Sequence, residues 1–152
     1  MDDPSGPWSA DETESFLTGT RIPIRLACRT PGGHLWMLSL WYRFRDGRFQ
    51  CATGADADVV RYVEADPGVA FEISTNDPPY RGVRGRGTAT VAPDDDKEVL
   101  RPLLERYLGG TDSELARTLL SPDREEVRVE IDPAKLHTWD YTGRMRDATA
   151  ED

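Results

Sequence analysis

The chain has 152 residues, which suits one domain with a sizeable core. Its 28 acidic and 19 basic residues give a net charge of −9, and lysine occurs only as Lys97 and Lys135. This balance argues against general binding to nucleic acid or to an anionic membrane surface, because both attract proteins with excess positive charge. We therefore expect a small-molecule substrate or ligand and neither of those two partners.

Other absences narrow the function further. No apolar run approaches the ~18 residues of a membrane span, and Met1-Asp2-Asp3-Pro4 lacks the basic start of a signal peptide. Cys28 and Cys51 form no CxxC pair and lie in apolar runs, which favours buried, reduced thiols. The sequence thus predicts a cytoplasmic protein. With only His34 and His137 available, a three-histidine site is excluded, and we predict no metal site.

The N-terminal half predicts one helix, several strands and a second helix. Ser9 and Glu12 have the spacing of a capping box, so we expect a helix over 9–18, ending at Gly19. Alternating apolar residues predict strands over 22–29, 34–44 and 48–53, the last two joined by a hairpin at Asp46-Gly47. Valines at helical spacing predict the second helix over 56–66.

The C-terminal half continues this pattern with strands over 69–74 and 80–92. A helix is expected to begin at the acidic run 94–96, a shorter helical piece follows over 115–120, and two strands are expected over 125–131 and 136–141. The order of strands is meander-like, which favours an α+β protein built on an antiparallel β-barrel. We expect one domain over 9–142, between a flexible N-terminus (1–8) and a flexible tail (143–152).

Arginines are concentrated in the strand predicted over 80–92. Arg84 and Arg86 share one face of that strand, where guanidinium groups suit a phosphate or carboxylate. Gly85 and Gly87 leave the other face bare, which would permit the close approach of a flat ligand. The alternative is an edge strand whose arginines pair with nearby acids.

The remaining chemistry-bearing residues are less informative. Trp41 and Trp139 would either stack on a heteroaromatic ligand or fill the core. His137 precedes Asp140 by three residues, so on a strand the two point to opposite faces and make a poor acid–base pair. No GxSxG, Walker or GxGxxG motif supports a hydrolase or nucleotide-binding reading. The sequence identifies no catalytic residue.

Five stretches carry a family resemblance through their order and spacing: Ile22–Ala27, Leu38–Tyr42 followed by Ala52-Thr53-Gly54, Ala65–Ala70, Pro79–Gly87 and Trp139-Asp140-Tyr141. Together they resemble the pyridoxamine 5′-phosphate oxidase-like family of FMN-binding split barrels, including its deazaflavin-using branch. The resemblance covers residues 14–141. It implies a split antiparallel β-barrel that forms a homodimer, with the cofactor at the interface between the two copies.

The resemblance also implies an activity and a site. The activity would be that of a flavin- or deazaflavin-dependent oxidoreductase using FMN or coenzyme F-420. Residues 38–40 would face the flavin ring, and Thr53 would reach the ribityl-phosphate end. The expected cofactor-binding set is Leu38, Ser39, Leu40, Trp41, Thr53, Arg84, Arg86 and Trp139.

One stretch departs from the family pattern. Where the family often has a Ser-Arg-Lys-like triplet for the cofactor phosphate, this chain has Ala57-Asp58-Val59. Losing two charge-assisted hydrogen bonds would remove roughly 3–6 kcal/mol of binding free energy. Three alternatives follow: Arg25, Arg61, Arg84 or Arg86 supplies the charge; the pocket takes a deazaflavin instead; or the barrel is a binding protein with an altered ligand or no cofactor.

Overall fold

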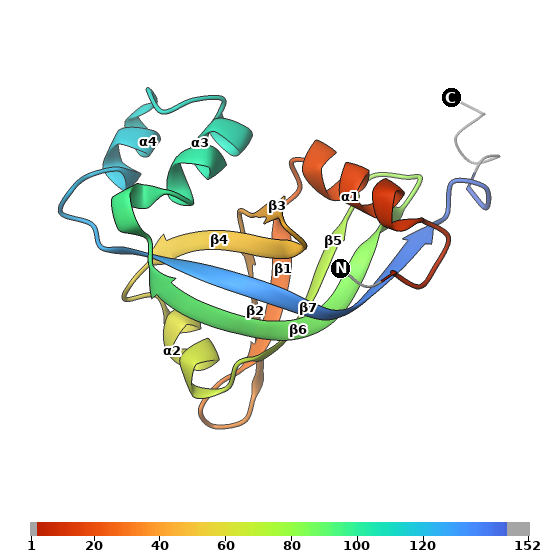
Figure 1. The fold of residues 1–152 in the computed structure, drawn as a ribbon, viewed down its shortest axis with the longest axis horizontal. Helices are drawn as coiled ribbons and strands as arrows, with labels where there is room; N and C mark the ends of the chain where they lie inside the picture. The colour runs from red at the N-terminus through yellow and green to blue at the C-terminus, as the bar shows by residue number, and fades with distance from the viewer. Residues whose placement is uncertain (1–2, 146–152) are drawn as a thin grey trace.

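The structure, a computed structural model, describes residues 3–145 and contains a single seven-stranded antiparallel sheet with helices around it (Figure 1). The elements are α1 (Ala10–Gly19), β1 (Ile24–Arg29), β2 (Leu35–Leu40), β3 (Arg43–Arg45), β4 (Arg48–Gly54), α2 (Asp58–Ala65), β5 (Gly68–Ser74), β6 (Arg81–Pro93), η1 (Asp95–Lys97, a 3₁₀ turn), α3 (Leu100–Leu108), α4 (Glu114–Leu119) and β7 (Glu126–Asp140). The strand order in the sheet is β2-β1-β5-β6-β7-β4-β3. The predicted α+β class is confirmed.

The chain itself forces this sheet to close into a barrel. Strands β2 and β3 lie at opposite edges of the sheet, yet only Trp41 and Tyr42 separate them in sequence. Three Cα–Cα steps cover at most about 11 Å, so the two edges must curl until they meet. The single strand predicted over 34–44 is therefore wrong: it is bent into two, with Tyr42 fully buried at the bend. The expected split antiparallel barrel is confirmed.

Two further features shape the barrel, a hairpin turn and a β-bulge. The hairpin between β3 and β4 turns at Asp46 and Gly47, whose φ values of 53° and 78° suit a two-residue turn, as predicted. The two strands predicted over 125–131 and 136–141 are one strand, β7. Its pairing with β6 shifts register between Arg86 and Gly87, and this bulge lets one strand serve both halves of the barrel.

The barrel interior holds the main apolar core, because the inward-facing residues of every strand are apolar. Both cysteines are buried there as free thiols, as the sequence predicts, and burial raises the pKa of Cys51 to about 12. A second, smaller cluster joins α3 and α4 to the outside of the barrel around Trp41. Figure 1 shows these two helices together beyond one end of β4, with α1 and α2 elsewhere around the barrel.

The helices begin where side chains cap them. Ser9 and Glu12 form the predicted capping box, and α1 extends through the expected terminus at Gly19. The helix expected from the acidic run 94–96 starts later, because the buried carboxylate of Asp94 accepts the backbone N–H groups of Val99 and Leu100 at 2.9 and 3.0 Å. Asp94 thus fixes the entry to α3.

The N-terminal segment runs beside β7. Ser5 forms a parallel bridge with His137, and its backbone is hydrogen-bonded to Leu136 at 3.0 Å and to Thr138 at 2.8 Å. Trp8 Nε1 donates to Asp140 at 3.2 Å. The composition predicted flexibility over 1–8, whereas Ser5 and Trp8 are hydrogen-bonded to β7. Most of the predicted tail (143–152) lies outside the described residues, and within 3–145 no helix is long and apolar enough to cross a membrane.

Candidate functional site

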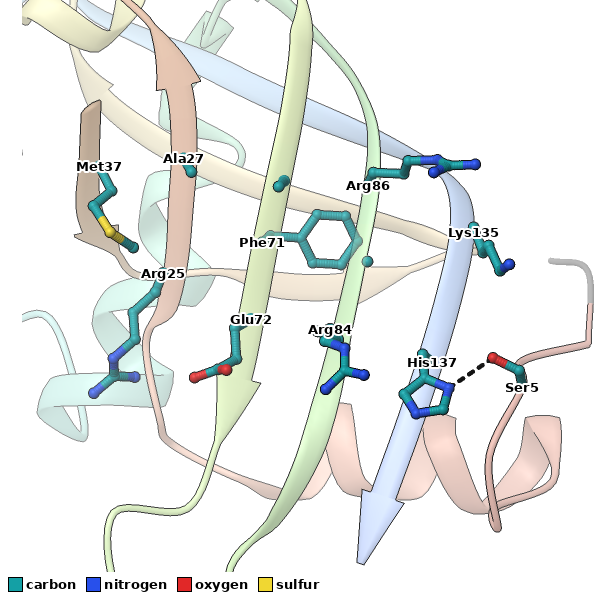
Figure 2. A pocket seen from close by; sticks show the side chains of 12 residues that line it. Ser5, Arg25, Ala27, Met37, Phe71, Glu72, Arg84, Arg86, Lys135 and His137 are labelled. Carbon is teal, nitrogen blue, oxygen red and sulfur yellow. Dashed lines mark hydrogen bonds between the residues drawn. The ribbon is translucent and has the colours of Figure 1, made fainter. Parts of the chain in front are cut away.

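A pocket of about 590 Å³ lies on the outer face of the sheet, over β1, β2, β5, β6 and β7 (Figure 2). Alternation along the strands explains it: residues that pair across these strands share one face, so Arg25, Glu72 and Arg84 form one row, ending at His137. A second row pairs Ala27, Ala70, Arg86 and Lys135 in the same way. The pocket is thus a surface of the open sheet face and not part of the barrel interior.

One side of the pocket is cationic. Arg84 and Arg86 on β6 and Lys135 on β7 are exposed, and within residues 3–145 none of the three forms an ion pair. The only carboxylate among the pocket residues is Glu72, which accepts a hydrogen bond from Ser74 at 2.8 Å. A chain with a net charge of −9 therefore presents a positive patch here.

The other side of the pocket is apolar in the second row, where Ala27, Met37 and Ala70 line it, while the first row there holds Arg25 and Glu72. The buried ring of Phe71 lies beneath, between β5 and β6 (Figure 2). Met37 is 63% exposed, and Leu35 on the same strand face is 77% exposed. A flat apolar group would therefore find an apolar strip directly beside the cations.

Gly85 and Gly87 of β6 allow neighbouring strands to pack closely, and they do not leave the bare face that was expected. A Cβ on Gly85 would lie 2.3 Å from the carbonyl oxygen of Lys135 and 2.8 Å from Phe71 Cζ. A Cβ on Gly87 would lie 2.2 Å from the carbonyl oxygen of Asp132. Atoms of β5 and β7 therefore already occupy the space beside Gly85 and Gly87 that a ligand would need. The edge-strand alternative is also wrong, because β6 lies between β5 and β7.

His137 is held by a side chain of the N-terminal segment. Its Nδ1 lies 2.8 Å from Ser5 Oγ, within hydrogen-bond distance (Figure 2). Asp140 is engaged elsewhere, accepting from Trp8 and Thr142, so the expectation that these two form no acid–base pair agrees with the contacts. Sequence reasoning missed Lys135 because the last strand was expected to begin after it.

The start of α2, where the family phosphate triplet was expected, has a different character. Asp58 is the first residue of α2, and its carboxylate binds Arg61 Nη2 at 2.5 Å. Ala57 provides no side-chain cap, and Val59 is only 1% exposed, packed into the core. Arg61, the cation in the first turn of this helix, is therefore paired with an acid, and the third triplet position faces the interior.

No protein-family model and no curated protein sequence matches the chain. Solved structures do match. A conserved hypothetical protein of Mycobacterium tuberculosis superimposes with a TM-score of 0.73 at 25% identity, covering 93% of this chain and 89% of its own. A protein named F420 reductase gives 0.68 at 22% identity, covering 80% and 94%. A candidate pyridoxamine 5′-phosphate oxidase of Listeria innocua gives 0.64 at 15% identity, covering 84% and 95%.

The chain has the split-barrel fold of the pyridoxamine 5′-phosphate oxidase-like family. The resemblance deduced from the five stretches is thereby confirmed at the level of the fold. In this split barrel, part of the expected cofactor-binding set comes together on the pocket face. Arg84 places its guanidinium carbon 5.4 Å from the ring centroid of Trp139, beside Arg86, and Ser39 lies on the same face opposite Arg25.

The other expected residues lie elsewhere in the split barrel. Leu38 and Leu40 face the other side of β2 and pack against the core. Trp41 stacks on Tyr107 of α3, with ring centroids 5.3 Å apart and an interplanar angle of 7°. Thr53 lies opposite Val127 on the inward face of β4. The structure therefore does not gather the eight residues into one site, and their role in cofactor binding stays a prediction.

Proposed function

We propose that this split barrel is a flavin- or deazaflavin-dependent oxidoreductase acting on a small molecule. The observation that carries the proposal is the outer-face pocket, where Arg84 and Arg86, which form no ion pair among the described residues, lie beside Trp139 and an apolar strip. The shared fold with a protein named F420 reductase supports the same reading. Flavins and deazaflavins combine a flat heteroaromatic ring with an anionic tail. The apolar strip suits the ring, and the arginines suit the tail.

The pocket residues fit such a cofactor in two respects. The strip formed by Ala27, Ala70 and Phe71 suits a flat ring, and the guanidinium groups suit a phosphate or carboxylate through bidentate hydrogen bonds. A bound flavin or deazaflavin would supply the hydride chemistry, while the protein supplies position and electrostatics. The start of α2 does not fit a phosphate, because Asp58 places a carboxylate there.

We also propose that the protein acts as a homodimer whose second copy covers this face. Leu35 and Met37 are strongly exposed on β2, which is an edge strand of the sheet. Apolar groups on an open strand are a frequent site of association between copies. Light scattering should give a dimer mass for the wild type and a monomer for Met37→Arg. A monomeric wild type would contradict the proposal.

The function is tested by titration of the purified protein with FMN and with coenzyme F-420, followed by absorbance and tryptophan fluorescence. We expect at least one of them to bind at or below tens of micromolar, and the bound cofactor to accept or donate a hydride in a substrate screen. Binding of neither cofactor at that concentration would contradict the proposal.

The second candidate is a binding protein with an altered ligand or no cofactor, favoured by the Asp58–Arg61 pair at the expected phosphate site. It predicts that FMN binding is weak because this site was lost. Restoring all three family residues would bury a lysine at position 59, so the test is limited to Ala57→Ser with Asp58→Arg. A rise of tenfold or more in FMN affinity would support this candidate, and unchanged affinity would contradict it.

A further inference from the structure

We propose that Arg86 and Lys135, flanked by Arg84 and His137, form a binding site for the phosphate or carboxylate group of the pocket's ligand. The inference rests on the proposed function only for the identity of that ligand. It assigns a role to Lys135 and His137, and it places the anion on β6 and β7 in place of the start of α2.

The first support is the pairing across the two strands. Arg86 lies directly opposite Lys135, and Arg84 lies directly opposite His137. Like charges directly opposite each other on adjacent strands are destabilising. Partners in such pairs have their Cβ atoms about 5 Å apart, so one anion placed between the two side chains can contact both. Each cation would then have a counter-charge, which no residue of 3–145 provides through an ion pair.

The second support is that neighbouring strands offer no compensating acid to Arg86 and Lys135. On its other side Arg86 faces Ala70, whereas Arg84 faces Glu72. Asp132, the acid nearest along β7, lies beyond the register shift and forms no ion pair within the described residues. The unbalanced charge is therefore centred on the Arg86–Lys135 pair.

The third support is the arrangement of the pocket. In the second row, Ala27 and Ala70 lie on β1 and β5, whereas Arg86 and Lys135 lie on β6 and β7, so the apolar strip and the two cations are side by side across the strands (Figure 2). Four adjacent strands span about 14 Å at a spacing of about 4.8 Å. A ligand lying across the strands would place an apolar body near Phe71 and its anionic group between Arg86 and Lys135.

The first experiment measures the thermal unfolding of the protein in inorganic phosphate, in malonate and in chloride, at equal ionic strength. The proposal expects phosphate or malonate to raise the melting temperature by about 2 °C or more over chloride, since a ligand bound only by the folded state stabilises it. Preference for phosphate indicates a phosphate-bearing ligand, and preference for malonate indicates a carboxylate-bearing one. No shift with either anion would overturn the proposal.

Variants separate this site from general charge effects. In Lys135→Gln and Arg86→Gln the melting temperature in chloride should not fall, because a repulsive pair has been relieved, while the shift caused by the anion should be lost. Arg45→Gln is the matched control, since Arg45 is 59% exposed and its only ion pair within residues 3–145 is with Asp46 at 3.8 Å. It should keep the full shift. A shift retained in both pocket variants would overturn the proposal.

A second experiment compares FMN with riboflavin, which differ only by the phosphate. The wild type should bind FMN at least tenfold more tightly, and Lys135→Gln should reduce that ratio while leaving riboflavin affinity unchanged. A ratio that Lys135→Gln does not alter would overturn the anion site. If neither flavin nor coenzyme F-420 binds, the proposed function fails, while the phosphate and malonate shifts still decide the anion site independently.

Discussion

The outward-facing residues of β6 and β7 differ on the two sides of the bulge between Arg86 and Gly87. Beyond the bulge, at what we call the paired end, Arg128 binds Glu98 at 3.1 Å and Asp94 at 3.6 Å, and Glu130 binds Arg48 at 2.9 Å. Before the bulge, at the pocket end, the exposed cations of both strands have no ion pair among the described residues.

This contrast is informative because both ends belong to the same pair of strands. At the paired end, Asp94, Glu98 and Glu130 form ion pairs with Arg128 and Arg48. Arg86 and Lys135 form none within residues 3–145. Among the described residues of these two strands, cations without acidic partners thus occur at the pocket end. Local departures from favourable pairing are typical of functional sites. Charges at the paired end stabilise the fold, whereas those at the pocket end are available to a ligand.

The largest expected effect lies at the paired end, at Asp94. Asp94→Ala removes the acceptor of two α3 backbone N–H groups and leaves Arg128 without a buried partner, so the free energy of unfolding should fall by about 3–5 kcal/mol. Chemical denaturation measures it. Asp95→Ala, at an exposed neighbour, should change it by less than about 0.5 kcal/mol. If the two substitutions lowered the free energy of unfolding equally, the stabilising role of Asp94 at the paired end would be wrong.

The border between the two ends is tested at Gly87. Gly87→Ala puts a methyl group against the carbonyl of Asp132, so we expect a loss of about 1–3 kcal/mol in the free energy of unfolding. Gly110→Ala is the control, because no atom lies within 4 Å of its added Cβ. If Gly87→Ala were as stable as the control, the register shift would not depend on the close approach of β6 to β7.

The paired end should also govern part of the acid sensitivity. The hydrogen bond from Gln50, together with Arg48, lowers the pKa of Glu130 below its ordinary 4.5. A lowered pKa contributes stability that is present above pH 4.5 and is lost as the pH falls through the folded-state value. Melting temperatures between pH 2.5 and 7 should fall less steeply for Glu130→Gln than for the wild type. Identical slopes would show that this cluster contributes nothing.

The smallest expected effect has the opposite sign. In low-salt chloride, Lys135→Gln should raise the free energy of unfolding by up to about 0.5 kcal/mol, because it relieves repulsion from Arg86. Arg48→Gln at the paired end should lower it, because Glu130 loses its partner. Denaturation curves at about 20 mM and about 500 mM salt, which span weak and strong screening, measure both effects. If both substitutions changed the free energy of unfolding in the same direction, the contrast between the pocket end and the paired end would be wrong.

Local signals in the sequence predicted much of the fold. The capping box at Ser9 and the Asp46-Gly47 hairpin depend on nearby residues, and both are confirmed. The bend after Leu40 and the unbroken β7 were missed, because both depend on which distant strands pair. Alternation alone identified Arg84 and Arg86 as neighbours on one face.

The rest of the pocket could not be predicted from local patterns. Lys135 and His137 join the arginines through a register that includes a bulge beside Pro133. Proline in a strand is compatible with a bulge, an edge strand or a strand start, so Pro133 alone does not fix the register. The role of Gly85 was misread for a similar reason: the atoms that exclude a side chain there belong to β5 and β7. Contacts between distant strands, which a single sequence does not display, decide both points.

The most direct test of the account is to map where the cofactor binds. Backbone amide spectra of labelled protein, recorded during titration with FMN and with coenzyme F-420, report the residues that a ligand perturbs. The account predicts that the largest shifts fall on residues 84–86 and 135–137, with residues 128–131 and the start of α2 little changed. Shifts centred on Asp58 and Val59, with β6 and β7 unperturbed before the bulge, would contradict it.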